Sequence, residues 1–130
     1  MDKTFYLDLD EYDLLGWEGD KLSDKVVSSI VEGISEEDEF PAVPVIKVND
    51  LTYCLCNKTR SMPNGKLSIL VDGGHHRAYG HYISNKPLKC YMSDTKEKPD
   101  LGKMTSISTW RPQEDHGEYE ERIEMFQDYR

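Results

Sequence analysis

The feature that most constrains this chain is an apolar run that ends in an aspartate. Two glycines and the basic start of a helix follow it. Residues 69–83 read Ile-Leu-Val-Asp-Gly-Gly-His-His-Arg-Ala-Tyr-Gly-His-Tyr-Ile. The apolar run predicts a strand, and the residues from His75 onward predict a helix. Glycines let the backbone approach a ligand closely, and the amides and positive dipole end of a helix favour anions. The order therefore predicts a phosphate site, although a tight turn with a solvated basic first turn fits the same residues.

The side chains around this turn are the candidates for contacts with phosphate. An arginine adds a permanent charge on a planar fork, and a histidine adds a titratable donor. His75 is expected to be one more phosphate donor, with a phosphoryl acceptor or a base as the less favoured alternative. Asp72 either holds Mg²⁺ that bridges phosphates or caps the amides of the turn. The candidate catalytic residues are Asp72 and His75, the candidate metal ligand is Asp72, and the candidate phosphate-binding residues are Gly73, Gly74, His75, His76 and Arg77.

Charge is segregated along the chain. Residues 1–40 hold 13 acids and 3 bases (−10), residues 41–111 hold 5 acids and 11 bases (+6), and residues 112–130 hold 7 acids and 2 bases (−5). General DNA binding is driven by phosphate neutralisation, so a net charge of −9 argues against it and leaves room for one small phosphorylated ligand. The acidic ends are either a solvated surface or a surface for a protein partner.

Length and composition indicate one domain of 130 residues. We expect the domain to occupy residues 1–103 and an acidic extension with a short helix to occupy residues 104–130. The three cysteines are an odd number in strand-like runs, which favours reduced, structural thiols. No apolar run approaches the ~18 residues of a membrane span, and the first residues lack the features of a signal peptide. We therefore expect a soluble, cytoplasmic protein without a membrane partner.

The remaining elements follow from periodicity and turn chemistry. Residues 4–9 alternate as a half-buried strand does, and Ser23 is a plausible N-cap for a helix that runs to Ile34. Further strands are expected at residues 43–48, 51–57 and 67–72, with a loop at residues 16–20 and a turn-rich connection at residues 57–66. The helix that opens at His75 should end near Asn85, because proline restricts the residue before it. A strand at residues 88–92 should close the sheet, and Tyr119, Ile123 and Phe126 mark one face of a final helix from about Glu118.

In this order and spacing, residues 4–93 resemble the ParB/sulfiredoxin superfamily. In that superfamily a strand runs into a Gly-x-His-Arg type turn that opens a helix and holds nucleotide phosphates. The resemblance implies an α+β fold, a small mixed sheet with helices mainly on one side. It implies a nucleoside triphosphate or diphosphate (ATP, ADP or CTP) as ligand, with Mg²⁺ as a candidate cofactor. It also implies that Lys25 and either Ser28 or Ser29 reach the nucleotide, and the apolar stripe of the first helix favours Ser29.

The departures from this superfamily narrow the expected chemistry. Sulfiredoxin reads Gly-Gly-Cys-His-Arg, and His75 replaces that cysteine here, so thiol chemistry is not supported. Chromosome-partition ParB proteins continue into a helix-turn-helix and a dimerisation module, and the residues after position 93 are too few for both. Archaeal free-serine kinases carry an Asp-Gly-His-His-Arg turn, from which residues 72–77 differ by a second glycine. We therefore expect a nucleotide-binding domain, with nucleotide hydrolysis or phosphoryl transfer as its candidate reaction. The alternative is a non-catalytic inhibitor or regulator of the phage or mobile-element type that binds a protein through its acidic ends.

Overall fold

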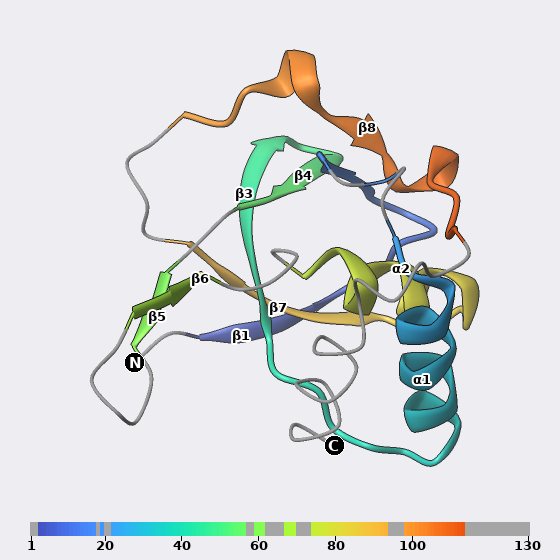
Figure 1. The fold of residues 1–130 in the computed structure, drawn as a ribbon. Coiled ribbons are helices and arrows are strands. Elements are labelled where there is room, and N and C mark those ends of the chain that lie inside the picture. The colour runs from blue at the N-terminus through green and yellow to red at the C-terminus, as the bar shows by residue number, and fades with distance from the viewer. Residues whose placement is uncertain are drawn as a thin grey trace.

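The computed structural model describes residues 3–17, 19, 22–56, 59–61, 67–69, 74–93 and 98–113. Within these residues six strands form one mixed sheet, two strands form a separate antiparallel pair, and two α-helices accompany them (Figure 1). The expected α+β class is therefore confirmed. The six-stranded sheet contains β1 (Thr4–Leu7), β2 (Asp13–Gly16), β3 (Val43–Asn49), β4 (Thr52–Leu55), β7 (Leu88–Met92) and β8 (Thr105–Ser106). The other elements are α1 (Asp24–Ser35), α2 (His75–Ile83), the 3₁₀ turns η1 (Leu101–Lys103) and η2 (Ile107–Thr109), and the paired strands β5 (Thr59–Ser61) and β6 (Leu67–Ile69).

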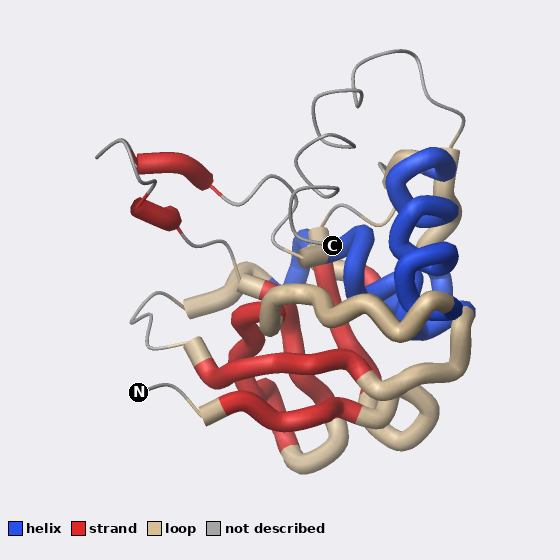
Figure 2. Tube along the Cα trace, turned by 90° about the horizontal axis from the view of Figure 1, so that it is seen from below, coloured by secondary structure: helices blue, strands red, loops and turns tan. Residues whose placement is uncertain are grey.

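The strand order of the large sheet is β1-β7-β3-β4-β2-β8. Two neighbouring pairs, β3 with β7 and β2 with β4, are parallel, and the other pairs are antiparallel. Figure 2 shows both α-helices gathered on one side of the sheet. The strand expected to close the sheet, β7, lies inside it between β1 and β3, because its register joins both neighbours. Among the described residues, no helix is long and apolar enough to cross a membrane.

Strong curvature of the sheet encloses the core. The rings of Phe5 on β1 and Tyr53 on β4 are 5.9 Å apart, although β7 and β3 lie between these strands in the sheet. Tyr12 extends this aromatic group with an edge-on contact to Tyr53 at 5.7 Å. Strands β1 and β4 therefore approach each other on this face of the sheet, and Ala78 of α2 packs in the same core. The core beneath them contains Leu7, Leu14, Val43, Val45, Leu55, Ala78, Leu88 and Cys90.

The first helix follows its sequence signals closely. Ser23 adopts an extended N-cap conformation, and its Oγ accepts a hydrogen bond from the Val26 N–H at 3.2 Å. The stripe of Val26, Val27 and Ile30 is buried, as the helical periodicity predicts. Because these signals are local, the N-cap and the buried face were both predicted correctly.

Residues 104–113 pack as part of the domain. β8 pairs with β2 in the large sheet, and Ile107 and Trp110 are each 1% exposed. The boundary expected after Lys103 therefore runs through a segment that belongs to the core. The final helix expected from Glu118 lies outside the described residues.

Two further expectations about strands differ from the structure. The loop expected at residues 16–20 overlaps the end of β2, a short strand that the sequence pattern did not indicate. The connection expected at residues 57–66 contains β5, which pairs with β6 from Thr59 opposite Ile69 to Ser61 opposite Leu67. Both strands are only three or four residues long, too short for a clear period of two.

Candidate phosphate-binding turn and its buried basic residues

The start of α2 requires glycine at position 74. Gly74 is the N-cap and has a φ of 96° and a ψ of 8°, in the left-handed region that side chains disfavour. A Cβ atom there would lie 2.4 Å from Cγ1 of the buried Val43. The first helical hydrogen bond follows at once, from the Ala78 N–H to the Gly74 carbonyl at 2.9 Å. The backbone of the predicted turn therefore lies directly on β3, while Asp72 and Gly73 lie outside the described residues.

His75 is fully buried and joins α2 to the end of β2. The N–H of Trp17 donates a hydrogen bond to His75 Nε2 at 3.0 Å. Its imidazole lies edge-on to the Trp17 ring, with centroids 4.5 Å apart, and 5.3 Å from the Trp110 ring. A Cβ on Gly16 would lie only 2.6 Å from Nε2, so the strand end depends on this close approach. Because Nε2 accepts a hydrogen bond, its lone pair is directed at Trp17.

His76 links the two helices. It is fully buried, and the N–H of Ser23 donates to its Nε2 at 2.8 Å. Since Ser23 is the N-cap of α1 and His76 belongs to the first turn of α2, one imidazole ring separates the amino ends of the two helices. This hydrogen bond spans 53 residues of sequence and brings both positive dipole ends toward the same region.

Arg77 is also inside the protein, with only 4% of its surface exposed. Its Nη1 donates to the carbonyl oxygen of Pro41 at 2.7 Å, just before β3 begins. The guanidinium therefore fixes the segment that connects α1 to β3. Direct phosphate contact by Arg77, His75 and His76 stays a prediction, and each of the three side chains also makes a structural contact.

The two candidates on α1 differ in exposure. Lys25 is exposed in the first turn, and Ser29 lies one turn further along and is half-buried. The first amide of α1 already has a partner, because the Asp24 N–H donates to the Gln113 carbonyl at 2.9 Å. The Gln113 N–H in turn donates to the Leu22 carbonyl at 2.8 Å, so residues 111–113 run alongside the start of α1. At the start of α1, Lys25 therefore presents an exposed ammonium group.

The cysteines lie in or next to strands β4 and β7. Cys54, Cys56 and Cys90 are free and buried. Burial raises the pKa of Cys90 to about 12, and burial together with the neighbouring Cys56 raises the pKa of Cys54 to about 11. The thiolate is the nucleophilic form of cysteine. At neutral pH both thiols are protonated, and neither is an activated nucleophile.

Sequence reasoning missed the residues that hold the turn in place. Each of these residues is distant in sequence from the residue that it contacts. Trp17 precedes His75 by 58 positions, and Pro41 precedes Arg77 by 36 positions. Trp110, which also contacts His75, lies near the end of the described residues. No short-range pattern identifies such partners. Among the described residues, no group of three or more His, Cys, Asp or Glu side chains could hold a metal ion.

Comparison with known proteins adds no family to these observations. No protein-family model, no curated protein and no solved structure matches the chain. The resemblance to the ParB/sulfiredoxin superfamily therefore stays a prediction based on the residues quoted above.

Proposed function

We propose that this chain is a nucleotide-binding domain that holds phosphates at the turn before α2. The observation that carries the proposal is the 2.8 Å hydrogen bond from the Ser23 N–H to His76 Nε2, which joins the amino ends of α1 and α2. Helix amino ends carry partial positive charge and are common anion sites. Gly74 has a left-handed backbone and no side chain, which lets the main chain at the start of α2 approach a neighbour closely.

The contacts above suggest a division of roles within the triplet. A phosphate oxygen accepts hydrogen bonds, and the Nε2 atoms of His75 and His76 also act as acceptors here. We therefore assign the Nε2 atoms of both imidazoles to holding the segment before α1 against α2, and Arg77 Nη1 to holding Pro41. Phosphate would then approach the amino end of α2 and the exposed ammonium of Lys25, with Ser29 further along α1. Asp72 remains our proposed ligand for Mg²⁺, since carboxylate oxygens suit that cation.

The test is a thermal-shift panel of ATP, ADP, CTP and GTP with and without Mg²⁺. A ligand that binds only the folded state stabilises it by RT ln(1 + [L]/Kd), about 2.7 kcal/mol at a hundred times Kd. One nucleotide should raise Tm clearly above the others, and Lys25→Ala should reduce that shift. Lys47→Ala, which removes the same charge from an exposed position on β3, is the matched control and should leave the shift unchanged. No shift with any nucleotide would refute the proposal.

A second candidate is a protein-binding regulator, favoured by the distribution of exposed charge. The basic side chains of the turn are buried, whereas Asp8, Asp10, Glu36 and Glu37 are exposed. An acidic surface of this kind steers and selects basic partners, and its binding weakens as salt rises. A chain that fails the nucleotide panel but binds a basic protein in a salt-dependent way would favour this candidate.

A further inference from the structure

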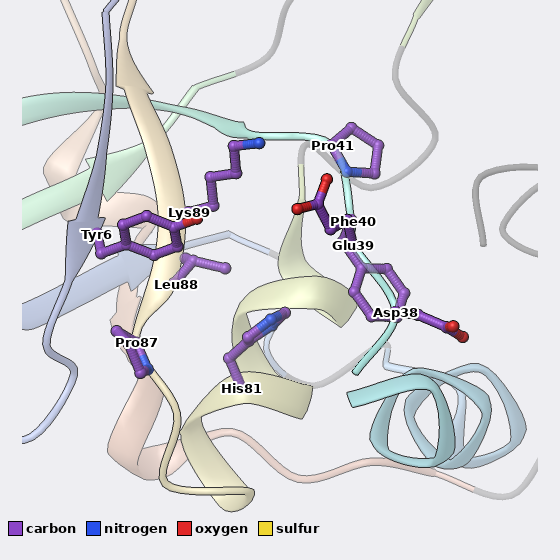
Figure 3. A pocket seen from close by; sticks show the side chains of 9 residues that line it. All are labelled: Tyr6, Asp38, Glu39, Phe40, Pro41, His81, Pro87, Leu88 and Lys89. Atoms are coloured by element: carbon purple, nitrogen blue, oxygen red, sulfur yellow. The ribbon is translucent and has the colours of Figure 1, made fainter. Parts of the chain in front are cut away.

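A small cavity opens between β1, β7, the middle of α2 and the segment that follows α1 (Figure 3). Its volume is about 110 Å³. The cavity lies beside the second turn of α2, where His81 lines it, and not at the first turn, which contains His75, His76 and Arg77. The residues that line it are Tyr6, Asp38, Glu39, Phe40, Pro41, His81, Pro87, Leu88 and Lys89. None of the residues assigned above to the phosphate site is among them.

His81 gives this cavity a hydrogen-bond acceptor. Its Nδ1 lies 2.6 Å from the carbonyl oxygen of Arg77. A carbonyl only accepts, so Nδ1 carries the hydrogen and Nε2 keeps a lone pair. The Phe40 ring stands edge-on to the imidazole at 5.7 Å, and Figure 3 shows the imidazole directed into the cavity. Burial lowers the pKa of His81, and the nearby Arg77 charge acts in the same direction, while the hydrogen bond to the Arg77 carbonyl opposes them.

A carboxylate and two aromatic rings complete the cavity. In Figure 3 the Glu39 carboxylate lies above the imidazole, and the rings of Tyr6 and Phe40 stand on either side of it. Tyr6 is 65% exposed, an unusual position for a large aromatic side chain. Lys89 lies on the rim, and neither it nor Glu39 forms an ion pair with another residue that the structure describes. The Glu39 carboxylate and His81 Nε2 are hydrogen-bond acceptors that lie between two aromatic rings. This arrangement suits a flat group that has several donors and a positive charge.

A second hollow continues from the first. Its volume is about 310 Å³, and it shares His81 and Pro87 with the small cavity. It adds the carboxylates of Asp8 and Asp10 and the ammonium of Lys86. Together the two hollows are lined by four acidic residues, Asp8, Asp10, Asp38 and Glu39, although Figure 3 shows the Asp38 carboxylate directed away from His81. Two lysines, Lys86 and Lys89, also line them, and the Arg77 guanidinium is near enough to act on His81. Four acids against three bases leave one net negative charge, which favours a cation, and the larger hollow leaves room for the chain that carries it.

We propose that the small cavity binds the guanidinium group of an arginine side chain presented by a partner protein. The guanidinium would donate to the Glu39 carboxylate and to His81 Nε2, and its plane would lie against the Tyr6 ring. A volume of about 110 Å³ admits the tip of one side chain and excludes a nucleoside. The described residues offer no set of three metal ligands, so a metal ion is not the occupant that the lining favours. The inference does not depend on nucleotide binding at the start of α2.

The probe for this proposal is N-acetyl-arginine-N-methylamide, titrated into the ¹⁵N-labelled full chain at low ionic strength. We expect saturable shifts at the amides of Phe40, His81 and Lys89, with a Kd in the millimolar range, about what one such contact supports. The citrulline analogue has the same shape without the charge and should bind at least roughly fivefold more weakly. Absence of saturable shifts at these amides, or equal binding of the citrulline analogue, would overturn the proposal.

Three variants determine the sign of the charge that the cavity selects. Glu39→Gln should weaken arginine binding roughly two- to fivefold, and Lys89→Gln should strengthen it by a similar factor. Glu32→Gln removes one negative charge from an exposed position on α1 and should change nothing. Weaker binding to Lys89→Gln would mean that the cavity takes an anion, and would overturn the proposal. If free L-arginine bound more than about tenfold tighter than the capped probe, the ligand would be a small molecule and the protein partner would be ruled out.

Discussion

Replacing Gly74 by alanine should destabilise the fold for two separable reasons. The first is the backbone, because a φ of 96° places the residue in the left-handed region, which costs an L side chain about 1 to 2 kcal/mol. The second is space, because the new Cβ would lie 2.4 Å from Cγ1 of Val43, a fully buried strand residue. Overpacking of this kind costs about 1 to 3 kcal/mol. The sum predicts a loss of about 2 to 5 kcal/mol in the free energy of unfolding.

Urea unfolding measures this loss directly. With a denaturant slope of about 2 kcal/mol per M, typical of a small domain in urea, the midpoint of Gly74→Ala should fall by roughly 1 to 2.5 M. Gly102→Ala is the matched control, because a Cβ there meets only Asp100 Oδ1 at 3.5 Å and no positive φ is involved. Its unfolding free energy should change by less than about 0.5 kcal/mol.

A double variant separates the steric term from the backbone term. Val43→Ala alone leaves a cavity and destabilises the protein, but it also removes the Cγ atoms that the new Cβ would strike. Gly74→Ala with Val43→Ala should therefore be less destabilised than the sum of the two single variants, by about 0.5 to 3 kcal/mol. Strict additivity, or a loss below about 0.5 kcal/mol for Gly74→Ala alone, would refute this account of the turn.

Three further predictions concern titration, thiol reactivity and the end of the chain. Burial lowers the pKa of His81 below its usual 6.5, so the free energy of unfolding should decrease as the pH falls through 6.5, where the unfolded state takes up a proton first. The slope of that free energy against pH, at most about 1.4 kcal/mol per pH unit for this group, should be smaller in His81→Phe when unfolding is measured between pH 7 and 5. Cys90, with a pKa near 12 from burial, should react with a disulfide reagent only upon unfolding, and rapid labelling of the native protein at pH 7 would contradict its placement. Removing residues 104–130 should unfold the domain, because loss of the buried Trp110 alone costs about 3 to 5 kcal/mol.

The sequence alone determined the elements whose signals are local. Ser23 caps α1, the apolar stripe of α1 is buried, and α2 begins at His75 after a glycine. Capping, helical periodicity and the left-handed preference of glycine all act within a few residues, so a sequence pattern contains them. The α+β class was implied by the resemblance to the ParB/sulfiredoxin superfamily, and the mixed sheet with two helices bears out the class.

Only the tertiary structure decided which side chains of the turn face inward. His75, His76 and Arg77 could read as a solvated basic helix start, yet each is buried by a partner that is distant in sequence, namely Trp17, Ser23 and Pro41. Burial of a polar group depends on finding a hydrogen-bond partner, and that partner is brought near by the packing of distant segments rather than by any local pattern. The packing of distant segments also explains three other features. They are the pairing of β2 with β8, the burial of Trp110 in the core and the cavity beside His81. A sequence indicates which groups can bind, and the packing of distant segments decides where those groups lie.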